Sequence, residues 1–92
     1  MFDLTGRLAL ITGAGQGIGA GIACHLAGQG ARVLVNDFYE ERAGATVDAI
    51  VKEGGEASSL AFDVTDRDAV VEKLRPLELD IVVNNAGNAG PT

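Results

Sequence analysis

Closely spaced glycines form the segment of this sequence best suited to binding an anion. Gly13, Gly15, Gly17 and Gly19 follow the apolar run 8–11 and precede a stretch with helical spacing of apolar residues. Because glycine has no Cβ, backbone N–H groups in such a turn can approach phosphate oxygens closely. The start of the following helix adds unpaired N–H groups and a partial positive charge. The pattern predicts a binding site for a nucleotide pyrophosphate, although glycine-rich turns can also be purely structural.

A carboxylate follows the next apolar run. Asp37 stands where its carboxylate can accept hydrogen bonds from the adenosine ribose hydroxyls of a dinucleotide, and its charge would repel a 2′-phosphate. Two unit charges about 4 Å apart interact by roughly 4 kcal/mol at an effective dielectric near 20. This favours NAD over NADP unless an arginine compensates, and we place Arg42 a helix away from the end of this strand. A helix-capping role for Asp37 is the alternative, and the two roles are compatible.

Two more polar segments follow the later apolar runs. Asp63 and Val64 come after the third run, and Asn85, Ala86 and Gly87 come after the fourth. A carboxylate beside the cofactor can accept a hydrogen bond from the adenine amino group, and a small Ala-Gly pair leaves room for a ribose. Taken alone, Asp63 could also be an ordinary loop acid.

Strands that alternate with helices must position these residues. Four strands are expected, at residues 7–12, 31–36, 56–62 and 79–83, and the first of them contains a short continuous apolar run. Helical spacing predicts a first helix at about 17–27, with Ile18, Ile22 and Leu26 on its apolar face. The small residues Gly19 and Ala23 lie on or beside that face and would let this helix pack close to the sheet. A second helix is expected at 40–53, and a third helix should follow a Thr65 cap and extend to about residue 75. We expect an α/β, Rossmann-like, doubly wound parallel sheet that is incomplete, with its first four strands in the order 3-2-1-4.

Composition narrows the class of protein. The chain has 92 residues, 47% hydrophobic and 22% charged, which is about one small globular domain. A net charge of −6 argues against a nucleic-acid partner, which would need a basic surface. The apolar runs are too short to span a bilayer, and no secretory signal is visible at the N-terminus. We therefore expect no membrane partner and a cytoplasmic location.

The single cysteine and the single histidine offer little chemistry. Cys24 and His25 both fall within the first expected helix. No second metal ligand lies one helical turn from His25, and an isolated thiol in such a helix is typically structural. We expect no metal site and assign neither residue a role.

The two glycine-containing motifs resemble those of the short-chain dehydrogenases/reductases. Residues 12–19 match the family's Thr-Gly-x-x-x-Gly-x-Gly cofactor motif, and residues 84–87 match its Asn-Asn-Ala-Gly motif. Asp63 falls where the family has an adenine-binding acid. The resemblance covers essentially the whole chain, and the Asn-Asn-Ala-Gly motif differs from the one usual in extended members of the family.

This resemblance implies a set of cofactor-binding residues and a preference for NAD(H). Gln16 agrees with that preference, because relatives that prefer NADP often have a basic residue there. Asn84 would help to brace the central strands. The implied cofactor-binding residues are Gly13, Gln16, Gly17 and Ile18 near the pyrophosphate, Asp37 and Phe38 near the adenosine, Asp63 and Val64 near adenine, and Asn85, Ala86 and Gly87 along the adjacent ribose.

No residue of this chain matches the family's catalytic Tyr-x-x-x-Lys motif. The only tyrosine, Tyr39, is followed four residues later by Ala43. We therefore expect residues 1–92 to be the N-terminal cofactor-binding part of an oxidoreductase, inactive alone, with its catalytic residues beyond Thr92. The resemblance implies hydride transfer between nicotinamide and a small alcohol or carbonyl substrate. We expect a homo-oligomer, or association with the rest of the polypeptide.

Two other functions fit parts of the pattern. A non-catalytic module could bind NAD(H) as a sensor or scaffold. An S-adenosylmethionine-dependent methyltransferase would also have a glycine-rich turn after the first strand and acids after the second and third. The Asn-Asn-Ala-Gly segment and the glycine spacing after Thr12 favour the dehydrogenase.

Overall fold

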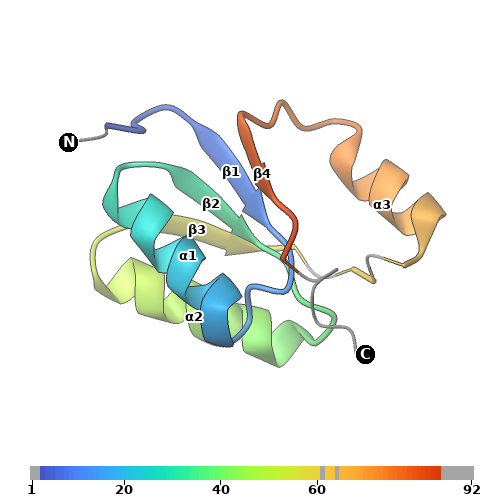
Figure 1. Cartoon of the computed structure of the whole chain (residues 1–92), viewed down its shortest axis with the longest axis horizontal. Coiled ribbons are helices and arrows are strands. Elements are labelled where there is room, and N and C mark those ends of the chain that lie inside the picture. The colour runs from blue at the N-terminus through green and yellow to red at the C-terminus, as the bar shows by residue number, and fades with distance from the viewer. Residues whose placement is uncertain (1–2, 61, 64, 86–92) are drawn as a thin grey trace.

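The computed structural model describes residues 3–60, 62–63 and 65–85 as a single parallel sheet with helices (Figure 1). The elements are β1 (Leu8–Ile11), α1 (Gly17–Gly28), β2 (Arg32–Val35), α2 (Glu40–Lys52), β3 (Glu56–Ser59), α3 (Arg67–Leu74) and β4 (Ile81–Val83). All strand pairs are parallel, and the order is β3-β2-β1-β4. The expected fold class and strand order are confirmed.

Strand pairing explains why β3 and β4 are shorter than the apolar runs predict. The last β3 residue, Ser59, pairs with Val35, which is itself the end of β2. Beyond that point, Leu60 donates one further backbone hydrogen bond to the Val35 carbonyl at 2.9 Å, and regular pairing stops. β4 likewise begins at Ile81, opposite Ala9 of β1. Apolar residues therefore lie beyond the paired part of each strand, for example Leu60 after β3 and Leu79 before β4.

The start of α3 differs from the expected Thr65 cap. The Thr65 hydroxyl instead donates to the Asp63 carboxylate at 2.7 Å. Asp66 is the capping residue, and its side chain accepts a hydrogen bond from the Ala69 N–H at 3.1 Å. Aspartate is preferred over threonine at the N-cap of a helix, which agrees with the choice of Asp66 over Thr65 as the capping residue.

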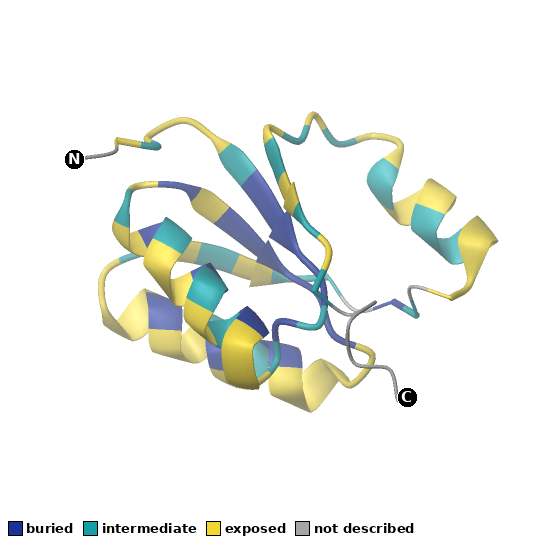
Figure 2. Ribbon diagram, in the orientation of Figure 1, coloured by how far each residue is buried: buried dark blue, intermediate teal, exposed yellow. Residues whose placement is uncertain are grey.

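The main hydrophobic core lies between the sheet and the pair α1 and α2 (Figure 2). The face of α1 that packs on the sheet carries Gly19, Ala23 and Ala27, all of which are buried. Ile22 and Leu26 of the expected apolar face are partly buried against this core, whereas Ile18 is 77% exposed. Small side chains let the helix axis approach the strands closely, whereas a row of Ile and Leu would hold it further away.

The second face of the sheet is covered unevenly. The register aligns Leu10 with Leu34 of β2 on one side and with Val82 of β4 on the other. Leu10 and Leu34 are buried, whereas Val82 is 58% exposed. α3 lies away from α1 and α2, beyond β4 (Figure 1), and none of its described residues is buried. The second face of the sheet is therefore buried at β1 and β2 and exposed to solvent at β4.

Candidate functional site

The segments that follow β1, β2 and β4 meet at the carboxyl edge of the sheet and are joined by hydrogen bonds. The Ala14 N–H donates to the Asn36 carbonyl at 2.7 Å. The Asn85 side-chain amide donates to the Gly13 carbonyl at 3.1 Å. The Thr12 hydroxyl donates to the Asn84 amide oxygen at 3.1 Å. This edge is where open α/β sheets bind their ligands.

The glycine turn holds two residues in the left-handed conformation, Gly13 and Gly17, each with φ of +62°. Gly17 is exposed, and a Cβ at this position would have no neighbour within 4 Å. The first N–H groups of a helix have no intrahelical partner. Gln16, at the start of α1, makes no side-chain capping hydrogen bond, and the first turn contains no acidic residue. The start of α1 can therefore accept an anion.

Gly19 is the glycine at which α1 closely approaches the segments that follow β1 and β4. A Cβ on Gly19 would lie 2.6 Å from the Asn85 amide nitrogen and would overlap the Gly13 carbonyl oxygen. Its absence therefore makes room for the hydrogen bond between Asn85 and Gly13. Gly19 belongs to the predicted glycine segment but is not among the cofactor-binding residues implied by the family resemblance, although its place as the last glycine of the motif was a usable signal.

Asp37 ties the glycine turn to the loop before α2. Asp37 lies two residues after the end of β2, and the residue is only 6% exposed. One carboxylate oxygen accepts from the Gly15 N–H at 3.0 Å, and the other accepts from the Tyr39 N–H at 3.0 Å. The helix cap itself is Tyr39, so Asp37 lies before the cap. A carboxylate oxygen has more than one acceptor site, so Asp37 retains capacity for a ligand hydroxyl.

Arg42 lies beside the end of β2, which corrects the expectation that it stands a helix away. A Cβ on Gly15 would overlap the Cβ of Arg42 and lie 2.5 Å from the Asp37 carboxylate. The three residues therefore surround one point of the glycine turn. The Arg42 guanidinium lies 4.6 Å from the centre of the Tyr39 ring. The reason for the error is geometric: Arg42 is in the first turn of α2, which starts next to this edge.

Asn36 is a site residue that the sequence analysis treated only as the end of a strand. It is 1% exposed, and its side chain accepts from the Gly13 N–H at 3.4 Å. The same amide donates to the carbonyls of Leu60 and Phe62 at 3.0 and 3.2 Å. It thus joins the segments after three strands. A buried asparagine directly after an apolar run was the available signal, because a buried amide must find partners.

The remaining candidate residues are dispersed. Ile18 and Phe38 are exposed, and the rings of Phe38 and Tyr39 meet edge to face at 5.0 Å. Asp63 accepts hydrogen bonds from the Thr65 hydroxyl and N–H, which lower the pKa of its carboxyl below the usual value. These bonds are local. The other expected residues, Val64, Ala86 and Gly87, lie outside the described residues.

Neither a cluster of metal-ligating side chains nor a membrane-spanning helix is present among the described residues. Among them, no three His, Cys, Asp or Glu side chains gather in a way that could hold a metal ion. In the same part of the chain, no helix has the length and apolar character needed to cross a membrane. The groups that this edge offers to a ligand are backbone N–H groups, side-chain amides and the buried Asp37 carboxylate.

The family model described as short chain dehydrogenase matches residues 7–92. The chain belongs to the short-chain dehydrogenase family. The matched residues include the glycine turn that follows β1. Membership leaves the methyltransferase alternative without support.

Characterised relatives and solved structures agree with this assignment. Gluconate 5-dehydrogenase of Gluconobacter oxydans is 41% identical over 92 residues, and 7alpha-hydroxysteroid dehydrogenase of Escherichia coli is 42% identical over 95. These alignments cover 95% and 96% of this chain and 36% of each relative. The crystal structure of a hydroxysteroid dehydrogenase from Escherichia coli superimposes with a TM-score of 0.84, at 40% identity over 98% of this chain and 40% of that one.

Another short-chain oxidoreductase, of metagenomic origin, was solved in complex with NADP. It superimposes with a TM-score of 0.85 at 37% identity, over 95% of this chain and 40% of that one. The chain thus spans little more than a third of the length of the short-chain dehydrogenases that it matches.

Proposed function

We propose that this chain forms the dinucleotide-binding part of a short-chain oxidoreductase that prefers NAD(H) to NADP(H). The observation that carries the proposal is the glycine turn whose Gly15 N–H is held by the buried Asp37 carboxylate. When bound, the nicotinamide of such a cofactor accepts or donates a hydride. The proposed substrate is a small alcohol or carbonyl compound, in keeping with the names of the two relatives, which denote dehydrogenases.

The residues present fit the pyrophosphate end of this cofactor. Gly17 is exposed, and a side chain at that position would occupy open space beside the start of α1. Gly13 keeps the turn tight with its positive φ. Ile18, 77% exposed on the first turn of α1, and Gln16 would flank the phosphates.

At the adenosine end, the proposal assigns cofactor choice to Asp37. Its carboxylate would accept from the ribose hydroxyls and would lie too close to a 2′-phosphate for both charges to be tolerated easily. Phe38, Asp63 and Val64 would lie around the adenosine. Asn85, Ala86 and Gly87 would line the adjacent ribose.

The proposal also covers the whole protein. We infer that residues 1–92 are its N-terminal part and that a tyrosine and a lysine after Thr92 move the proton during hydride transfer. We further infer a cytoplasmic homo-oligomer without a nucleic-acid or membrane partner. A chain that binds NADH and lacks that tyrosine and lysine would instead be a non-catalytic module.

The test is a comparison of NADH, NADPH and S-adenosylmethionine binding to the full-length protein by calorimetric titration. We expect NADH to bind most tightly. In Asp37→Ala the ratio of the NADPH Kd to the NADH Kd should fall by about tenfold or more, because the opposing charge is gone. Asp48→Ala, which removes an exposed acid from the outer part of α2, is the matched control and should leave the ratio unchanged.

Two outcomes would contradict the proposal. Equal affinity of the wild-type protein for NADPH and NADH would show that Asp37 does not select the cofactor. Tight binding of S-adenosylmethionine with no binding of either dinucleotide would overturn the oxidoreductase assignment itself.

A further inference from the structure

A buried threonine of α2 binds the backbone of the glycine turn. The Thr46 hydroxyl donates to the Ala14 carbonyl at 2.8 Å. Thr46 is 5% exposed and Ala14 is fully buried, so bulk water does not reach this bond. A buried carbonyl without a donor costs free energy, and the hydroxyl of Thr46 meets this requirement of the turn.

The needs of α2 itself do not explain a threonine at this position. The buried residues of this helix are Ala43, Thr46 and Ile50, and Thr46 is the polar one among them. Threonine forms helices less well than alanine, and its hydroxyl commonly bonds a carbonyl of its own helix. Here the hydroxyl donates instead to Ala14, in a segment that precedes α2 by two elements. The contact with the turn is therefore what the hydroxyl adds.

Thr46 and Asp37 bind the two ends of one peptide group. The carbonyl of this group, on Ala14, accepts from Thr46, and its N–H, on Gly15, donates to the Asp37 carboxylate at 3.0 Å. Because a peptide group is planar, its C=O and N–H rotate together. A rotation that moved the carbonyl away from Thr46 would also move the N–H away from Asp37. Glycine at position 15 has no Cβ to resist such a rotation, so the hydrogen bonds must hold the peptide in place.

We propose that Thr46 is a positioning residue that holds the Asp37 carboxylate in place for the dinucleotide through the peptide between Ala14 and Gly15. This inference rests on the proposed function, since it needs the ribose hydroxyls of the dinucleotide to bind Asp37. Thr46 is too buried to touch the ligand itself. Its contribution to affinity therefore exists only while Asp37 is present.

Calorimetric titration of NADH into the full-length protein tests the inference in four variants. Thr46→Val keeps a similar shape without the hydroxyl and should raise the NADH Kd about threefold or more, the scale of one net hydrogen bond. Thr46→Ala also removes the hydroxyl, with a better helix former, and should give the same rise. Thr46→Ser keeps the hydroxyl and should stay within about twofold of the wild type. Ile50→Val trims the same buried side of α2 beside Gly55 and should leave the NADH Kd unchanged.

A double-mutant cycle with Asp37→Ala separates positioning from a merely structural role. Where Asp37 is already alanine, Thr46→Val should change the NADH Kd by less than about twofold, because the group that Thr46 positions is gone. A general loosening of the fold would give the same factor with and without Asp37. That equal factor, an unchanged NADH Kd in Thr46→Val and Thr46→Ala, or a Thr46→Ser variant as weak as Thr46→Val would overturn the inference and leave the proposed function standing. Failure of the wild-type protein to bind NADH would contradict the proposed function as well.

Discussion

At the scale of single residues, the glycines of the turn do different work. Gly17 supplies a left-handed backbone conformation in open space, whereas Gly19 supplies room for an amide of a distant segment. Gly21, two residues further along α1, has neither a positive φ nor a close neighbour. Substitutions at these three positions should therefore have three distinct effects.

Gly19→Ala should lower the free energy of unfolding by about 1–3 kcal/mol, the usual cost of overpacking. The new Cβ meets the Gly13 carbonyl oxygen and the Asn85 amide and must displace one of them. Urea unfolding of the full-length protein measures the change. Gly21→Ala is the control, since an exposed helical glycine replaced by alanine should raise stability by about 0.4–1 kcal/mol. Similar destabilisation by both variants would contradict the role given to Gly19.

Gly17→Val should abolish dinucleotide binding. A β-branched residue is strained at a φ of +62°, and its side chain fills the space proposed for the pyrophosphate. Gly17→Asn, which tolerates the left-handed conformation better, should restore stability but not affinity. Unchanged NADH affinity in Gly17→Val would mean that the phosphates bind elsewhere.

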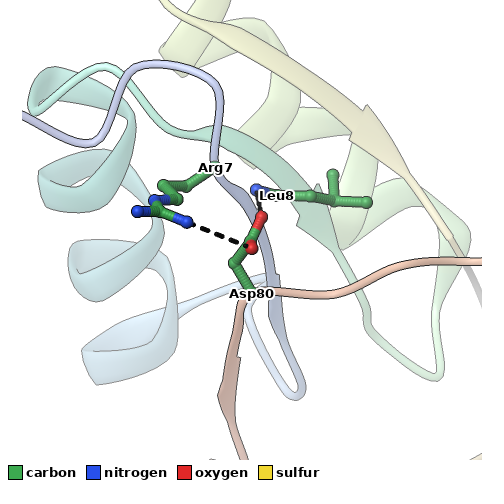
Figure 3. Close-up of polar contacts among 3 residues, drawn as sticks. All are labelled: Arg7, Leu8 and Asp80. Carbon is green, nitrogen blue, oxygen red and sulfur yellow. Dashed lines mark hydrogen bonds and ion pairs between the residues drawn. The ribbon is translucent and has the colours of Figure 1, made fainter.

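At the scale of elements, a single acid joins the beginnings of β1 and β4. The Asp80 carboxylate accepts from the Leu8 N–H at 2.8 Å, and its other oxygen lies 3.5 Å from Arg7 Nη1 (Figure 3). The Asp80 N–H in turn donates to the Leu8 carbonyl at 2.8 Å. This pair of bonds closes a loop of the chain from residue 8 to residue 80 and sets where β4 begins beside β1.

Asp80→Ala should lower the free energy of unfolding by about 1 kcal/mol, the usual net value of one hydrogen bond. Arg7→Ala should cost less than about 0.5 kcal/mol, because an exposed ion pair contributes little. Asp80→Asn keeps an acceptor for the Leu8 N–H and should lie close to the wild type in urea unfolding of the full-length protein. If it is as unstable as Asp80→Ala, the ion pair and not the hydrogen bond holds the two strands.

At the scale of the whole molecule, the sheet ends in an apolar edge. β4 pairs with β1 on one side only, and Val82 is 58% exposed. α3 lies beyond β4 and buries none of its described residues. A short apolar edge strand with little charge favours pairing with other polypeptide.

Residues 1–92 expressed alone should be inactive and should self-associate. The chain contains no tyrosine that is followed four residues later by a lysine, so the family's catalytic motif is missing. The edge of β4 that faces away from β1 can pair with a strand of another molecule. Sedimentation velocity and binding of a hydrophobic dye measure the association, and Val82→Lys should reduce it by placing a charge on the exposed face. A soluble monomer with a cooperative melt and no dye binding would refute this prediction.

The sequence by itself determined the features that depend on residues close together in the chain: the order of strands and helices, the glycine turn and the acid after the second strand. The alternation of apolar runs with helical spacing predicted the parallel sheet and its order, because right-handed crossovers leave few topologies. The glycines after residue 12 located the turn, because a tight turn needs residues without Cβ. Asp37 was found because it follows a buried run directly.

Only the tertiary structure decided which distant residues meet. Asn36, Arg42 and Gly19 became part of the site through contacts with Gly13, Gly15 and Asn85, and no local pattern encodes those contacts. The tertiary structure also decided which residues of α1 turn fully inward: Gly19, Ala23 and Ala27 are buried, whereas Ile18 is exposed. The physical reason is the same in each case: packing distance and hydrogen-bond geometry depend on register between strands, which the periodicity of one segment does not specify.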